Sequence, residues 1–134
     1  MPVLDLMTTG YASTLVNNTD ELLVTLTAQG AGTTIYGPFY NPKAALRLAI
    51  NIASVTGSLT VTLLGFDNSS GATWTVLASA ALSAAGLTLI SVGPFVAAAA
   101  NVTAQAYAPV FYELQCVVVN GPVTATIGAH GIGQ

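Results

Sequence analysis

Apolar and polar residues alternate along much of this chain with a period of two, the pattern of a strand with one buried face. The clearest stretch runs from Ala45 to Ala53. Its leucines and isoleucines at every second position from 46 to 52 face one way, and Arg47 faces the other. This pattern predicts a half-buried strand that carries Arg47 on its outer side.

Other stretches have the same strand character, and no stretch has a well-capped helical period. They are Glu21 to Thr27, Thr33 to Tyr36, Leu59 to Leu64, Trp74 to Ser79, Leu87 to Val92, Val110 to Val119 and Val123 to Gly128. The segment Ala80 to Gly86 consists of small residues, and we leave it open between a turn and a short helix.

Turn residues separate these strands. Thr56-Gly57-Ser58 and Asn120-Gly121 each stand between two alternating stretches, so we expect two β-hairpins there. Gly37-Pro38 and Gly93-Pro94 are each followed by Phe and are expected to close a strand, because proline cannot donate to a sheet. This echo is either simple punctuation or the trace of a duplication.

These strands predict an all-β protein, an antiparallel β-sandwich or a jelly-roll-like barrel of seven to eight short strands. The 134 residues suit a single domain, with residues 1–20 as a candidate extended N-terminal arm.

Charged side chains are unusually scarce, at 5% of residues against about 25% in an average soluble domain. They are Asp5, Asp20, Glu21, Lys43, Arg47, Asp67 and Glu113. The protein therefore has either a neutral, Thr-rich exterior or, as we favour, a surface largely covered by partners. A net charge of -3 argues against nucleic acid and against a basic membrane-binding surface.

The long uncharged stretch from Val76 to Ala100 is interrupted by several serines and by Gly93-Pro94. A bilayer-spanning helix needs about 20 mostly apolar residues without such breaks, so we expect no membrane span. The N-terminal MPVLDLMTTG lacks the basic and apolar parts of a signal peptide.

Residues that carry chemistry are few. His130 is the only histidine and Cys116 the only cysteine, so a catalytic triad, a zinc site and an intrachain disulfide are not expected. His130 lies near the end of the chain and is expected to be solvent-exposed or at an interface. Asp67 and the polar residues after it match no standard calcium loop, and we expect a turn there. No catalytic residue, metal or cofactor is predicted, and the protein is not expected to be an enzyme.

Two aromatic clusters stand beside prolines. They are Tyr36, Phe39 and Tyr40 around Pro38, and Tyr107, Phe111 and Tyr112 around Pro109. Aromatic side chains usually pack in cores and interfaces, although a row of them on a sheet also suits sugars. We predict these six residues as exposed contact patches.

The segment from Ala45 to Pro94 resembles small β-sandwich proteins of tailed bacteriophage particles. The resemblance rests on SLTVTL at 58–63, GFD at 65–67, Gly71 and WTVL at 74–77, and the later VTATIGAHG fits the same plan. It covers about two thirds of the chain and little of residues 1–30.

The resemblance implies a structural role in the virion, with no family catalytic residues to transfer. The expected function is that of a capsid decoration or minor head protein on the capsid surface. Its expected partners are the major capsid protein and further copies of itself, a trimer being favoured. The alternative is a carbohydrate- or receptor-binding module associated with a tail or fibre.

Overall fold

A computed structural model describes residues 21–133 and contains no helix in that range. Its strands are β1 (Glu21–Gln29), β2 (Gly32–Tyr40), β3 (Ala45–Val55), β4 (Ser58–Phe66), β5 (Thr73–Ala78), β6 (Gly86–Gly93), β7 (Thr103–Gln105), β8 (Phe111–Val119) and β9 (Val123–Ile132). The expected N-terminal arm lies outside the described residues. None of the described segments is a helix able to cross a bilayer.

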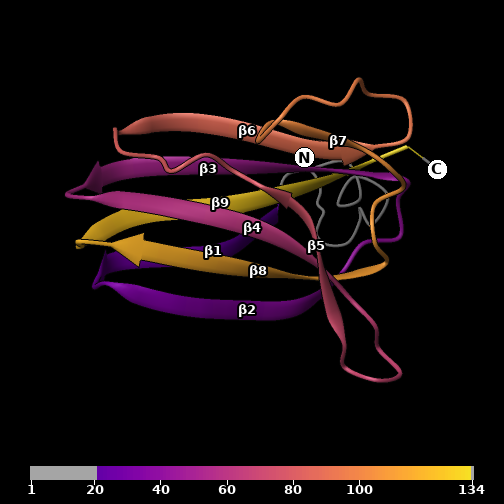
Figure 1. Ribbon diagram of the computed structural model, residues 1–134, viewed down its shortest axis with the longest axis horizontal. Helices are drawn as coiled ribbons and strands as arrows, with labels where there is room; N and C mark the ends of the chain where they lie inside the picture. Colours follow the sequence, from indigo (N-terminus) through magenta and orange to yellow (C-terminus); the bar gives the residue numbers. More distant parts are fainter. Residues whose placement is uncertain (1–20, 134) are drawn as a thin grey trace, which may run out of the picture.

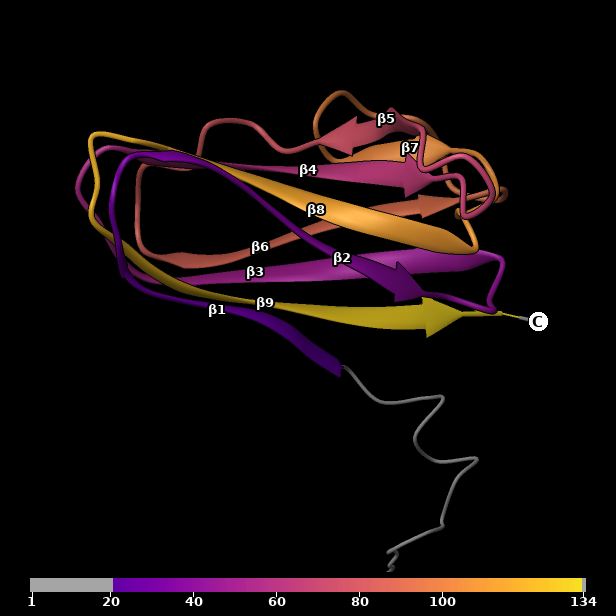
Figure 2. The ribbon, with the colours of Figure 1, turned by 90° about the horizontal axis from the view of Figure 1, so that it is seen from below.

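The strands form two sheets that pack face to face (Figure 1; Figure 2). Sheet A has the order β1-β9-β3-β6-β7, and sheet B has the order β2-β8-β4-β5. All neighbours are antiparallel except β6 and β7. The two sheets remain separate layers and do not close into a barrel, so the all-β sandwich prediction is confirmed.

Most connections cross from one sheet to the other. The chain alternates between sheets A and B from β1 to β4, and it crosses again between β8 and β9. Apart from β7, each sheet then contains four strands, most of whose neighbours come from distant parts of the sequence. This is the double-layer order of a jelly roll.

The core lies between the sheets and is built from the inward side of each strand. Sheet A contributes Val24, Leu26, Leu46, Leu48, Ile50, Ile52, Ile90, Val92, Val123, Ala125, Ile127 and Ala129, all buried. Sheet B contributes Leu59, Val61, Leu63, Leu77, Tyr112, Leu114, Cys116 and Val118. The inward alternation predicted for Leu46 to Ile52 is confirmed, and Arg47 lies on the other side.

The eight strands expected from the sequence are all present, but both predicted hairpins are wrong. β3 and β4 belong to different sheets, as do β8 and β9, so Gly57 and Asn120-Gly121 turn between layers. Alternation reports only which side of a strand is buried. Two such sides can lie next to each other in one sheet or face each other across the core, and here they face each other.

Tight turns of this kind gather at one end of the sandwich, which we call the arch end (Figure 2). A Cβ at Gly57 would lie 1.9 Å from the backbone oxygen of Val119, and one at Gly121 would lie 2.7 Å from that of Gln29. The backbone of Thr56 also donates a hydrogen bond to Pro122. These connections therefore pack closely against one another, which leaves no room for side chains at the two glycines.

Gly37-Pro38 does not end its strand, contrary to expectation, whereas Gly93-Pro94 does. β2 continues to Tyr40, and its register with β8 shifts between Tyr36 and Phe39. Because β2 is an edge strand with a local irregularity, a proline that lacks an N–H group is tolerated.

Two short segments, β7 and residues 80–86, have little regular structure. The three-residue strand β7 was not predicted, because it is too short to show alternation. The segment Ala80 to Gly86 is not helical. Its Leu82 pairs with Leu59 through two backbone hydrogen bonds of 2.9 and 2.8 Å.

Candidate functional site

Aromatic side chains gather at the end of the sandwich opposite the arch end. At this aromatic end β2, β4, β6 and β9 finish and β1, β3, β5 and β8 begin. Every aromatic residue within 21–133 except Tyr36 lies on these strand ends or on the loops between them. The turns of the arch end, by contrast, contain no aromatic residue. The two ends therefore differ in the surface that they offer to a ligand or partner.

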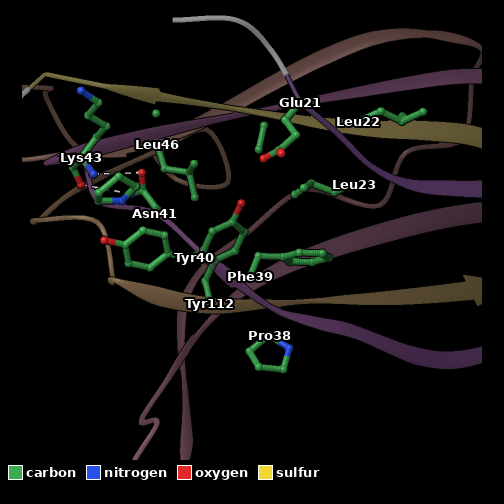
Figure 3. A pocket seen from close by; sticks show the side chains of 13 residues that line it. Glu21, Leu22, Leu23, Pro38, Phe39, Tyr40, Asn41, Lys43, Leu46 and Tyr112 are labelled. Carbon is green, nitrogen blue, oxygen red and sulfur yellow. Dashed lines mark hydrogen bonds between the residues drawn. The ribbon is translucent and has the colours of Figure 1, made fainter. Parts of the chain in front are cut away.

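A pocket of about 680 Å³ opens at the aromatic end, where β1 and β9 of sheet A lie opposite β2 and β8 of sheet B (Figure 3). Its walls are about equally polar and apolar. The apolar and aromatic residues that line it are Leu22, Leu23, Pro38, Phe39, Tyr40, Pro42, Leu46, Tyr112, Ala129 and Gly131. Glu21, Asn41 and Lys43 supply polar groups. Its volume lies within the range of small-ligand sites.

The corner between β2 and β3 is fixed by Asn41, which is buried. Its Oδ1 accepts a hydrogen bond from the backbone N–H of Lys43, and its Nδ2 donates to the Lys43 carbonyl. Its own backbone N–H donates to Val110 at 2.7 Å and so ties this corner to the segment before β8. The amide is thus a structural group, and Lys43 and Glu21 are the charged groups of the pocket.

Tyr112 is the buried aromatic residue of the pocket. Its hydroxyl points toward the side on which Glu21 lies (Figure 3). Burial raises the pKa of the Tyr112 phenol well above its ordinary value, and the negative charge of Glu21 raises it further. The phenol therefore keeps its proton at neutral pH and is a hydrogen-bond donor, with no property of a base.

A second hollow, which we call the Trp74 groove, is a shallow and largely open depression beside the β4–β5 turn. It is lined by Phe66, Asp67, Asn68, Ser69, Trp74, Ala108, Pro109, Val110 and Phe111. The rings of Phe111 and Tyr40 pack at 5.5 Å with a 45° tilt. Since Tyr40 lines the first pocket and Phe111 lines the groove, this ring pair separates the two hollows.

The polar rim of the groove is the turn predicted around Asp67. Asp67 Oδ1 accepts hydrogen bonds from the backbone N–H and the hydroxyl of Ser69, and Oδ2 accepts one from the Ser70 hydroxyl at 2.6 Å. The Ser70 bond above all, followed by the two from Ser69, holds the pKa of Asp67 below its usual value. The carboxylate is therefore ionised and held in a fixed orientation.

The six predicted contact residues divide into two groups. Tyr40 and Tyr107 are mostly exposed, and Phe111 is partly so. Tyr36 and Phe39 pack against the core, and Tyr112 is 2% exposed. The expectation of an exposed patch is wrong for Tyr112, because its position on β8 has the same inward parity as Leu114.

His130 lies in a regular strand near the end of the chain. It is part of β9, is half-buried, and is the cross-strand neighbour of Arg47 on the outer side of sheet A. No group of three potential metal ligands occurs among residues 21–133. Cys116 is buried in the core, and burial raises the pKa of its thiol to about 11, so it is a poor nucleophile at neutral pH.

The polar residues of the first pocket and the place of Trp74 in the groove were not predicted from the sequence. Glu21 and Lys43 are 22 positions apart in the sequence and line the same pocket only because the start of β1 and the end of β2 lie at the same end of the sandwich. The GFDNSSG turn followed by a tryptophan was a signal for the groove, but nothing local showed that the loop before β8 would form its other wall.

The comparisons with known proteins leave the family open. The sequence matches no protein-family model, and no curated protein is significantly similar to it.

Proposed function

We propose that this protein is a structural component of a virus particle, a capsid decoration or minor head protein that binds over the major capsid shell as a homo-oligomer. The observation that carries the proposal is a nearly uncharged outer face of sheet A, with exposed leucines and Arg47 as its charged residue. Jelly rolls are common among capsid proteins, but that likeness of fold is supporting analogy only.

One row of neighbours crosses sheet A on its outer side. It consists of Leu22 on β1, Gly128 on β9, Ala49 on β3 and Leu89 on β6. Leu22 and Leu89 are 64% and 46% exposed, and Leu87 next to this row is 63% exposed. The small residues of the row, Gly128 and Ala49, lie between the exposed leucines. The row therefore offers an apolar surface that a partner can cover.

Charge is nearly absent from the same face. Arg47 is the only formally charged residue on β3, β6 and β9. A partner that covers this face therefore removes apolar area from water, at about 25 cal/mol per Å², with little cost of charge desolvation. Repetition of such a contact around a symmetric shell multiplies a modest contribution.

The first test is the composition of purified particles. Quantitative mass spectrometry should find this chain in a fixed ratio to the major shell protein, and its absence from particles would sink the proposal. Light scattering after size exclusion should give a homo-oligomer, with a trimer favoured. A clean monomer at micromolar concentration contradicts the oligomer.

A matched pair of variants tests the docking face. Leu89→Asp places a charge in the apolar row of sheet A and should lower the occupancy on particles at least about tenfold, a change of about 1.4 kcal/mol. Ile35→Asp places the same charge on sheet B, where Ile35 is similarly exposed, and should leave the occupancy unchanged. The reverse result would assign docking to sheet B.

The second candidate function is a carbohydrate- or receptor-binding module on a tail or fibre. The Trp74 groove favours it, since an exposed aromatic ring beside a rigid polar turn suits a sugar better than a protein shell. Localisation by electron microscopy of intact particles separates the two candidates, because it places the chain either on the head or on the tail.

A further inference from the structure

The indole of Trp74 is held in place by the strand beside it. Trp74 on β5 is the cross-strand partner of Gly65 on β4, and a Cβ added at Gly65 would lie 2.1 Å from the ring atoms Cε2 and Cζ2. The indole therefore covers the bare glycine backbone, as aromatic residues do when they shield a glycine in a sheet. This contact fixes the ring before any ligand arrives.

Trp74 is still open to solvent, since 51% of the residue is exposed, and its side chain lines the groove. The π face of an aromatic ring carries partial negative charge and attracts polarised C–H groups. A pyranose ring presents such C–H groups on one face and hydroxyl groups around its edge. An open, immobilised indole therefore supplies a stacking surface for one sugar ring.

The rim of the groove supplies hydrogen bonds for the edge of that sugar. The carboxylate of Asp67 has about four acceptor positions, of which Ser69 and Ser70 occupy three. Oδ2 keeps one acceptor position for a ligand hydroxyl. The side-chain amide of Asn68, which also lines the groove, offers both a donor and an acceptor.

Charge selects among ligands. The described lining of the groove contains Asp67 and no lysine or arginine. An anionic ligand such as a uronic acid or a phosphorylated sugar would meet a carboxylate with no cation to compensate it. A neutral, hydroxyl-rich ligand matches a stacking ring beside acceptor and amide groups.

We propose that the Trp74 groove binds neutral oligosaccharides, with one sugar ring stacked on Trp74 and its hydroxyl groups bonded to Asp67 and Asn68. The groove is shallow and open, so it suits a sugar chain that lies on the surface with one ring against Trp74. This inference deepens the second candidate function and is independent of the docking of sheet A on a shell.

Trp74 is the only tryptophan in the chain, so its fluorescence reports on this groove alone. The full chain is titrated with neutral gluco-, manno-, galacto- and N-acetylglucosamine oligosaccharides, with an oligogalacturonate as the anionic control. At least one neutral series should change the Trp74 emission in a saturable way and give matching calorimetric binding. The oligogalacturonate should bind at least about tenfold more weakly.

Trp74→Ala should weaken binding at least about tenfold by calorimetry, and Phe95→Ala should leave it unchanged. Phe95 is a suitable control because it is exposed at the same end and does not line the groove. Gly65→Ala retains the tryptophan but displaces its ring, so it should also weaken binding. If that variant fails to fold, Trp74→Phe, which keeps a smaller ring, should fall between wild type and Trp74→Ala.

Two results would overturn the inference. One is that no neutral series binds. The other is a Trp74 emission that depends on protein concentration and not on sugar, together with a smaller oligomer in Trp74→Ala, which would place a second copy in the groove. Neither result touches the shell proposal, which is tested separately by the occupancy of Leu89→Asp on particles.

Discussion

The two ends of this sandwich are built on opposite principles. At the arch end, small residues allow backbone segments to pack on one another, and Gly57 and Gly121 leave no space for a side chain. At the aromatic end, large rings and longer loops surround two hollows. One end therefore joins the two layers, while the other presents surface to ligands, and substitutions at the two ends should have different consequences.

The largest effect should come from the arch end. Gly57→Ala drives a Cβ into the Val119 carbonyl, so it should lower the free energy of unfolding by about 3 kcal/mol. Gly30→Ala is the matched control, since its Cβ meets nothing within 4 Å, and it should stay within about 0.5 kcal/mol of wild type. Urea unfolding measures both. Equal effects would mean that the close packing of the arches is unimportant.

The next effect concerns alkaline pH and the two raised pKa values on β8. Burial raises the pKa of Cys116 from 9.0 to about 11 and that of Tyr112 further above its ordinary value. Both folded-state values lie above those of the unfolded chain, so the stabilisation is complete below about pH 9 and is lost as the pH rises. The Cys116 contribution alone should fall by up to about 2 kcal/mol by pH 11.

The stability of Cys116→Ala combined with Tyr112→Phe should be much less sensitive to pH between 8 and 11, measured by urea unfolding at each pH. Tyr107→Phe is the control, because Tyr107 is 73% exposed and should leave the wild-type fall in place. A double variant that loses stability as steeply as wild type would show that other groups control the alkaline limit.

The smallest effect concerns the ring pair that separates the hollows at the aromatic end. A double-mutant cycle with Tyr40→Ala and Phe111→Ala should give a coupling of about 0.5–1 kcal/mol, as expected for tilted rings at 5.5 Å. The same cycle with Phe95→Ala and Phe111→Ala should give none. Absence of coupling in the first cycle would mean that the ring pair does not stabilise the aromatic end.

Predictions from the sequence were most accurate where the physics is local. Alternation located eight strands and correctly placed Leu46, Leu48, Ile50 and Ile52 inside, because the side of a strand that is buried depends on every second residue. The GFDNSSG turn was also predicted, since Asp67 bonds to serines only two and three positions away. The scarcity of charge is likewise a property of the sequence itself.

Only the tertiary structure decided which strands are neighbours and which residues meet. A turn at Gly57 or Asn120 is compatible with a hairpin or with a crossing between layers, and the choice depends on pairing between strands far apart, such as β3 with β9. The same long-range pairing buries Tyr112, brings Glu21 and Lys43 to one pocket, and lays Trp74 over Gly65. The sequence determined the strands and their buried faces because burial follows the local alternation of apolar and polar residues. The hollows depend on contacts between residues far apart in the sequence, which local alternation does not predict.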